Sequence, residues 1–136
     1  MIKSIATAAA LAGLIATGAS AQEDAGRAEY INACAGCHGA SGKGDGPLAG
    51  LLNIHTPDLT TLAANNDGAF PFEYTLWMVD GRKIIRAHGE DMPVWGDRYM
   101  ASARSMEASS ETPESRELIV RGRVLSLVYY LESIQE

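Results

Sequence analysis

The last part of the chain carries apolar residues at a spacing typical of an α-helix. Between residues 120 and 134 they follow one another at intervals of 4, 3, 4 and 3. This spacing places them on one side of a helix, as an apolar stripe that faces a core. We therefore predict a helix from Ser115 to Gln135 that packs through Val120, Val124, Leu127, Leu131 and Ile134.

Further helices are predicted from their ends as well as from their interiors. A first helix is expected over residues 24–35. Another is expected from Pro71 to Val79, with a proline at its start and Asp80-Gly81 as its stop signal. Asp58 is a suitable cap for a short helix over residues 58–62. Together these elements predict an all-α fold.

Residues 1–21 have the pattern of an export signal. Lys3 provides a short positive region, an Ala/Leu/Ile-rich run follows over residues 5–19, and Ala19-Ser20-Ala21 is a small-x-small cleavage site. The run is short for a transmembrane helix, which needs about 20 apolar residues, so an uncleaved anchor is the less favoured alternative. We expect cleavage after Ala21, a mature domain over residues 22–136 and a location in a bacterial periplasm.

The composition fits one globular domain. The chain has 136 residues, of which 46 % are hydrophobic and 21 % charged, close to ordinary globular proteins. Eleven Lys and Arg against 17 Asp and Glu give a net charge of −6. Nucleic acids and anionic lipids select basic surfaces, so we expect neither as a partner. Two cysteines provide no disulfide framework, and a large bound cofactor would stabilise the small core.

The two cysteines belong to Cys34-Ala35-Gly36-Cys37-His38, the C-x-x-C-H attachment signature of a c-type haem. Two thiols at this spacing can each bond one vinyl group of the same porphyrin, and the adjacent imidazole can bind its iron. A redox-active disulfide is one alternative, although no βαβ pattern surrounds the motif. Half of a zinc site is another, which would need His55 or His88. We favour one covalently bound haem c, attached through Cys34 and Cys37, with His38 as the proximal iron ligand.

Residues 22–136 resemble the class I c-type cytochromes over nearly their whole length. Gly26 lies eight residues and Tyr30 four residues before Cys34, on one face of the predicted first helix. In that family, a small residue and an aromatic residue at these places form the crossing of the N- and C-terminal helices. The resemblance implies a small cytochrome c fold of three to five helices around the haem, with Tyr130 packed over the first helix.

The Gly-rich segment over residues 39–47 is similar to the H-G-x-x-G-x-G-D-G-P loop of many small bacterial cytochromes. Its glycine density disfavours a helix, and the Lys-Ser/Thr ending of a phosphate-binding loop is missing. In the family, the carbonyl of a loop proline accepts a hydrogen bond from the proximal imidazole and thereby orients the ring. We expect Pro47 in this role, with Pro57 as the alternative.

The run Met92-Pro93-Val94-Trp95-Gly96 is similar to the M-P-x-W/F-G distal loop of the same family. The resemblance implies Met92 as the second iron ligand, held over the iron by the proline that follows it. His88 is the main rival, since a haem with two histidine ligands would have a lower potential. The other candidates are His55, Met78, Met100 and Met106; we expect Met78 in a helix core and Met100 and Met106 in a solvated loop.

Trp95 and Arg98 are candidate contacts of the haem propionates. The indole of Trp95 can donate a hydrogen bond to a carboxylate, or the ring can simply fill the core. Arg98 belongs to the only basic concentration of this acidic chain, together with Arg82, Lys83 and Arg86. These side chains form a solvated face or neutralise buried carboxylates, which are very costly when unpaired.

A polar stretch over residues 101–116 is longer than a minimal cytochrome requires, and we expect it to be exposed and mobile or to dock a partner. The resemblance implies a periplasmic single-haem electron carrier, not an enzyme, with a low-spin His/Met haem and with redox proteins as donor and acceptor. The first alternative is a haem subunit of a larger oxidoreductase. A catalytic or gas-binding haem protein is the second, and it requires that Met92 is not a ligand. We expect no membrane insertion after signal cleavage.

Overall fold

A computed structural model describes residues 22–82, 92–105 and 112–136, and this described part of the chain contains helices and loops but no strand. The all-α prediction is therefore confirmed. The predicted export signal, His88, Lys83, Arg86 and Met106 lie outside the described residues. The helical segments are an N-terminal helix over residues 22–33, α2 (Ala35–His38), η1 (Ala49–Leu51), η2 (Leu59–Thr61), α3 (Phe72–Asp80), α4 (Trp95–Ser105) and α5 (Pro113–Ser133).

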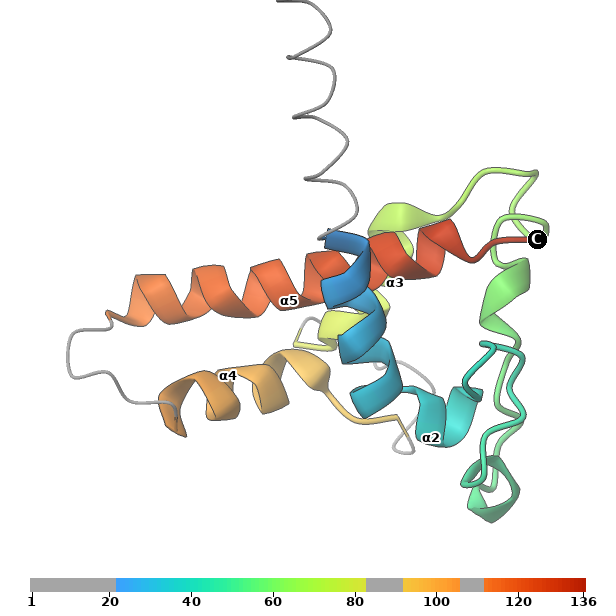
Figure 1. The fold of residues 1–136 in the computed structure, drawn as a ribbon, viewed down its shortest axis with the longest axis horizontal. Helices are drawn as coiled ribbons and strands as arrows, with labels where there is room; N and C mark the ends of the chain where they lie inside the picture. The colour runs from blue at the N-terminus through green and yellow to red at the C-terminus, as the bar shows by residue number, and fades with distance from the viewer. Residues whose placement is uncertain (1–21, 83–91, 106–111) are drawn as a thin grey trace, which may run out of the picture.

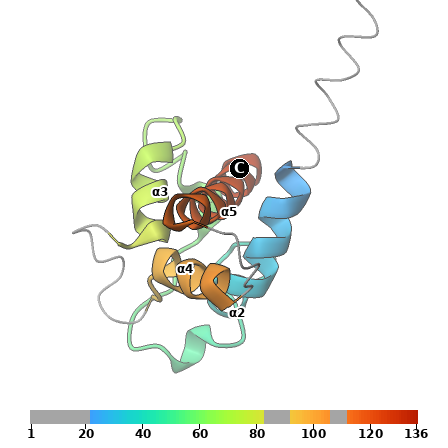
Figure 2. The same ribbon diagram turned by 90° about the vertical axis from the view of Figure 1, so that its left-hand side faces the viewer.

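Helix α5 is the centre of the fold. In Figure 2, which looks along α5, the helix has α3 on one side, the N-terminal helix on the other and α4 below it. Its apolar stripe is buried as the residue spacing predicts, and each fully buried Val or Leu contributes roughly 1.5–3 kcal/mol. The buried residues of α5 are Val120, Val124, Leu127, Val128, Tyr130 and Leu131.

The N-terminal helix crosses α5 near the C-terminal end of α5 (Figure 1). The crossing is close because Gly26 has no side chain: a Cβ atom there would collide with the backbone carbonyl of Ser126 and with Tyr130. The rings of Tyr30 and Tyr130 pack with centroids 5.2 Å apart, and the Tyr30 hydroxyl donates to the carbonyl of Gly39 at 2.7 Å. The predicted crossing of the N- and C-terminal helices is confirmed, with Gly26, Tyr30 and Tyr130 as its contact residues.

Arg123 on α5 joins three helices. Its guanidinium donates to both carboxylate oxygens of Glu29 on the N-terminal helix, at 2.7 and 2.9 Å. The same group lies 4.0 Å from the ring centroid of Tyr99 on α4, which is cation–π geometry. This contact holds α4 and the N-terminal helix against the same stretch of α5.

Helix α4 corrects the prediction for residues 101–116. Residues 101–105 belong to α4, and α5 begins at Pro113, two residues before the predicted start, with Thr112 as its cap. The buried residues of α4 are Gly96, Tyr99 and Ala103, and Met100 packs against the core although a solvated loop was expected. Glycine and alanine give this inward stripe little apolar area, so the periodicity was too weak to be recognised in the sequence.

The C-terminus is tied to the loop around η2. Gln135 accepts a hydrogen bond from the backbone N–H of Ala63 at 2.9 Å and donates to the carbonyl of Leu59 at 2.8 Å. The backbone N–H of Glu136 donates to Thr60, and its carboxylate pairs with Lys43 at 2.7 Å. Within the described ranges, no helix has both the length and the apolar character needed to cross a membrane.

Candidate functional site

The C-x-x-C-H motif forms one tight turn of backbone. The N–H groups of Cys37 and His38 both donate to the carbonyl of Cys34, at 3.1 and 2.9 Å, and α2 contains only Ala35–His38. Both cysteines are free thiols. Burial raises the pKa of the Cys34 thiol to about 12, because the apolar surroundings disfavour the thiolate.

His38 is buried, with 7 % of its surface exposed, and its ring is oriented by a backbone carbonyl. The Nδ1 atom lies 3.2 Å from the carbonyl oxygen of Pro57. A donor at Nδ1 leaves the Nε2 lone pair available for a metal. Because a carbonyl can only accept, this contact favours the tautomer with the proton on Nδ1, which is the one that an iron ligand at Nε2 requires.

The proline beside the His38 ring is Pro57. The prediction favoured Pro47 and is wrong on this point. Pro47 is exposed and lies between two residues that are hydrogen-bonded to the motif. The N–H of Gly46 donates to the carbonyl of Cys37, and the N–H of Leu48 donates to the carbonyl of Gly36. These bonds hold Pro47 along the outside of α2. Gly44 has a positive φ of 78° and lies against the carbonyl of Thr56, so the chain folds back and brings the Thr56-Pro57 pair beside the imidazole.

Gly46 shows how tightly the Gly-rich segment is packed on the motif. A Cβ atom at this position would lie 2.5 Å from the carbonyl oxygens of both Gly36 and Cys37. Any side chain would therefore push the loop away from α2. The glycine is required by this close approach of two backbones.

A cleft next to α2 brings the predicted attachment and ligand residues together. Cys34, Cys37, His38 and Met92 all line it, and Trp95 is a fifth predicted residue in its wall. The rest of the lining is mostly apolar, and none of the described lining residues is Asp, Glu, Lys or Arg. Its remaining members are Ala33, Leu52, Ile54, His55, Thr56, Pro57 and Pro93.

The residues that line this cleft have the chemistry that a covalently attached haem needs. Two thiols, one imidazole and one thioether in an apolar cleft are the donor set of a c-type haem with histidine and methionine ligands. A further observation is the Thr56 hydroxyl, which is buried and has no hydrogen-bond partner among the described residues. Such a group is costly unless a ligand or a water satisfies it. Cys34 and Cys37 would carry the porphyrin, and His38 and Met92 would hold the iron.

Of the other proposed iron ligands that the structure describes, His55 alone is brought to this cleft. His55 is in its wall, whereas Met78 lies on α3 and Met100 on α4, where it packs against the core. His88 and Met106 lie outside the described residues. Among the described candidates, Met92 and His55 are thus the two that can face a bound group here.

Trp95 and the basic residues have contacts of their own. The Trp95 ring packs against Tyr99 with centroids 5.8 Å apart, and the exposed guanidinium of Arg98 lies 5.3 Å from the Trp95 centroid. Arg82 is paired with protein carboxylates, at 2.6 Å from Asp80 and 2.7 Å from Glu117. The propionate contacts of Trp95 and Arg98 stay predictions, whereas Arg82 has Asp80 and Glu117 as its partners.

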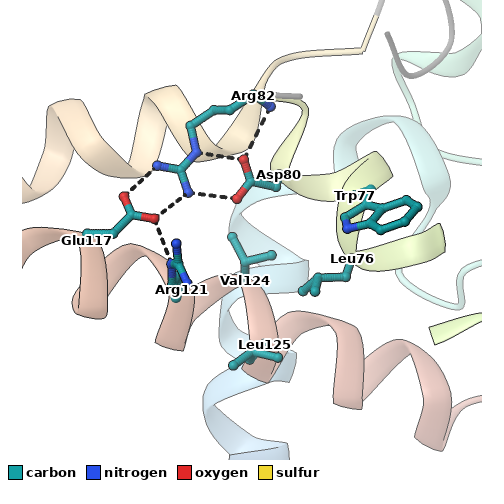
Figure 3. A pocket seen from close by; sticks show the side chains of 8 residues that line it. All are labelled: Leu76, Trp77, Asp80, Arg82, Glu117, Arg121, Val124 and Leu125. Atoms are coloured by element: carbon teal, nitrogen blue, oxygen red, sulfur yellow. Dashed lines mark hydrogen bonds and ion pairs between the residues drawn. The ribbon is translucent and has the colours of Figure 1, made fainter. Parts of the chain in front are cut away.

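A second cavity of about 380 Å³ lies between α3 and α5, and it is different in character (Figure 3). Its apolar wall is formed by Leu76, Trp77, Val124 and Leu125. The other end holds the ion-pair network of Arg82 with Asp80 and Glu117, which Arg121 extends. None of its described lining residues is Cys, His or Met, so the cleft beside α2 is the candidate haem site.

Part of the cleft wall was missed by the sequence reasoning. Leu52, Ile54 and Thr56 line it but belong to no motif. A signal was present, because residues 46–57 contain no Asp, Glu, Lys or Arg in a chain that is 21 % charged. An uncharged run directly after an attachment motif indicates a segment that covers an apolar group.

Comparison with known proteins agrees with this geometry. A family model described as cytochrome c matches residues 23–102. The match includes the attachment motif, the Gly-rich segment and the run from Met92 to Gly96, and it ends within α4. No curated protein and no solved structure matches the chain.

Proposed function

The chain belongs to the cytochrome c family of haem-binding electron carriers, and we propose that it is an exported, periplasmic cytochrome whose single haem is ligated by His38 and Met92. The observation that carries this proposal is that both side chains line the same cleft as Cys34 and Cys37. The covalently bound haem c supplies the one-electron chemistry. The chain attaches it, orients it and determines its potential.

Each residue of the cleft has a physical role in this proposal. The Pro57 carbonyl accepts from Nδ1 of His38, which orients the imidazole and makes it a better donor. As the second ligand, the neutral thioether of Met92 would favour the ferrous state and so raise the potential. The apolar wall acts in the same direction, because the ferric state has one more positive charge to desolvate.

Electron transfer is favoured over catalysis in this proposal because His38 and Met92 would both hold the iron. They would leave no open position at which a substrate could bind. The donor and acceptor in this proposal are other redox proteins.

Replacement of Met92 tests the ligand assignment. We expect Met92→Ala to abolish the weak near-infrared absorption band of the oxidised protein that is characteristic of sulfur ligation, to lower the midpoint potential and to allow carbon monoxide to bind the reduced protein. Met100→Ala is the matched control, because Met100 packs against the core away from the cleft, and it should keep the band. Persistence of the band in Met92→Ala, or carbon monoxide binding by the unmodified protein at neutral pH, contradicts the assignment.

One observation favours a second candidate function, a haem subunit of a larger oxidoreductase. Leu118 and Ile119 are exposed on α5, at 72 % and 39 %, in a part of the chain beyond the family match. A permanent contact would bury these side chains. Elution of the native protein with a second polypeptide at constant stoichiometry would support this candidate over a free carrier.

The proposed export is tested on the mature protein. Cleavage after Ala21 predicts a mature chain of residues 22–136 that carries one haem. We expect intact-mass measurement to give the mass of that chain plus one haem, and a chain that begins at Met1 contradicts the cleavage.

A further inference from the structure

The cavity between α3 and α5 is separate from the haem cleft. Its volume is about 380 Å³, which is at the small end of the range of ligand-binding pockets, roughly 300–1,000 Å³. No described residue lines both this cavity and the cleft beside α2. Electron transfer at the haem makes no use of the cavity, and the chemistry of its lining indicates what it can hold.

Part of the cavity wall is apolar and incompletely buried. Leu76 and Trp77 come from α3, and Val124 and Leu125 come from α5; Figure 3 shows them beside the ion-pair network. Leu76, Trp77 and Leu125 are half-buried, so a ligand that covers them removes further apolar surface from water. The cavity therefore favours a ligand with an apolar body.

The acidic side chains of the network already have a partner for each of their oxygens. Arg82 donates from Nε and Nη2 to the two oxygens of Asp80, and from Nη1 and Nη2 to the two oxygens of Glu117. A cationic ligand could pair with either carboxylate only by displacing Arg82, which would leave that half-buried guanidinium without its partners. A cation is therefore the least suitable ligand for this cavity.

Arg121 is the member of the network with unused hydrogen-bond donors. Its Nε donates to Glu117 at 2.8 Å, whereas its two terminal nitrogens have no hydrogen-bond partner among the described residues. The side chain lines the cavity and is 68 % exposed, so a ligand can reach it. Two parallel N–H groups of a guanidinium match the two oxygens of a carboxylate.

We propose that the cavity between α3 and α5 binds a small organic acid, a monocarboxylate with an aliphatic or aromatic body, whose carboxylate pairs with Arg121 and whose body covers the apolar wall. This inference goes beyond the proposed electron transfer. A phosphate dianion fits less well, because its second charge would meet Asp80 and Glu117 without a second free guanidinium in the described lining. The net charge of −6 opposes any anion at long range, but salt screens it over about 8 Å, so the contact with Arg121 decides.

Octanoate is the probe, titrated into the reduced holoprotein and followed by proton–nitrogen correlation NMR. The chain has two tryptophans, Trp77 in the wall of this cavity and Trp95 in the wall of the haem cleft. We expect octanoate to shift the indole N–H signal of Trp77 and to leave that of Trp95 in place. A ligand of this size should bind with a roughly millimolar Kd, and the absorption spectrum of the haem should stay unchanged.

Two substitutions test the two parts of the site. Arg121→Gln removes the guanidinium while Arg82 still pairs with Glu117, and we expect it to raise the Kd for octanoate at least about tenfold, as loss of a charge-assisted hydrogen bond does. Leu125→Gln should also raise the Kd, because it makes the wall polar. Arg27→Gln is the matched control: it removes the same charge from an exposed position of the N-terminal helix and should keep the Kd within about twofold.

Two further ligands complete the test. Octylammonium has the same chain with the opposite charge, and acetate has the carboxylate without the chain, so we expect both to bind at least about tenfold more weakly than octanoate. Equal binding of octylammonium and octanoate, or an unchanged Kd in Arg121→Gln, would overturn the carboxylate assignment.

The site itself is overturned by either of two results. One is an unshifted Trp77 signal up to about 10 mM octanoate, ten times the expected Kd. The other is a shift of the Trp95 signal, or a change of the haem spectrum, without a shift of Trp77, because it would place the ligand in the haem cleft. Neither result bears on the proposed ligation of the iron, which the Met92→Ala spectra test separately.

Discussion

At the scale of single residues, Gly26 is the most demanding position of the helix crossing. A Cβ atom there would meet the backbone of Ser126 as well as the Cβ of Tyr130, and neither can move without separating the helices. We expect Gly26→Ala to lower the free energy of unfolding of the holoprotein by about 1–3 kcal/mol, the range of overpacked sites. Guanidinium unfolding, followed by far-ultraviolet circular dichroism, measures the change.

The matched control is another glycine of the same helix pair. Gly122 on α5 is exposed, and a Cβ atom there would meet nothing within 4 Å. Alanine is the better helix former, so Gly122→Ala should raise the free energy of unfolding by about 0.5–1 kcal/mol. Equal effects of the two substitutions would show that the crossing tolerates a side chain at position 26.

The residues of the site were predictable where a local pattern determines the chemistry. The presence of Cys34, Cys37 and His38 in the cleft wall follows from one motif, and that of Met92 from a second one. The choice of Pro57 over Pro47 was not predictable. It depends on the turn at Gly44, which brings Pro57 beside the imidazole. Both prolines are far enough along the chain from His38 for a loop to bring either of them back to its ring.

At the scale of elements, the Asp80–Arg82–Glu117 network joins the end of α3 to α5. Hydrogen bonds from Arg82 and then Arg121 lower the pKa of Glu117 to about 2, and Arg82 also lowers the pKa of Asp80. A carboxyl whose folded pKa lies below its unfolded value of about 4.3 stabilises the fold above that pH and loses this contribution as the pH falls. The link between the two helices therefore weakens in acid, between about pH 4.3 and pH 2.

Glu117→Gln isolates this contribution. We expect the variant to be less stable than the wild type above pH 5 by up to about 1 kcal/mol, the range of partly exposed ion pairs. The difference should shrink as the pH falls towards 3, as measured by urea unfolding at stepped pH. Glu132→Gln, on an exposed position near the other end of α5, is the control. If the difference in the free energy of unfolding between the wild type and Glu117→Gln is the same at pH 3 and pH 7, the role of the network is contradicted.

The predictability of an element depends on how much apolar area its inner face carries. The stripe of α5 contains valines, leucines and a tyrosine, so its periodicity identified the helix and its buried face. Helix α4 presents Gly96, Tyr99 and Ala103 to the core, and its outer face is polar. Only the tertiary contact with α5 distinguishes it from a solvated loop, and no pattern in the sequence reports that contact.

At the scale of the whole molecule, Gln135 closes the fold by connecting the last turn of the chain to residues 59–63. Its side-chain amide accepts a hydrogen bond from the N–H of Ala63 and donates to the carbonyls of Leu59 and Leu131. Removal of this side chain leaves these partly buried backbone groups without that partner. We expect Gln135→Ala to lower the free energy of unfolding by about 1–3 kcal/mol and to speed hydrogen exchange of the Ala63 amide. The neighbouring Glu136→Ala removes only the exposed pair with Lys43, which solvent screens, and should leave the free energy of unfolding almost unchanged. Unchanged protection of the Ala63 amide in Gln135→Ala contradicts the closure.

The surroundings of Cys34 come from both ends of the chain. Its sulfur lines the cleft beside α2, and burial disfavours its thiolate. The helix that precedes Cys34 packs on α5 through Tyr30 and Tyr130. A truncation that removes the last turns of α5 would therefore also loosen the segment that carries the first attachment cysteine.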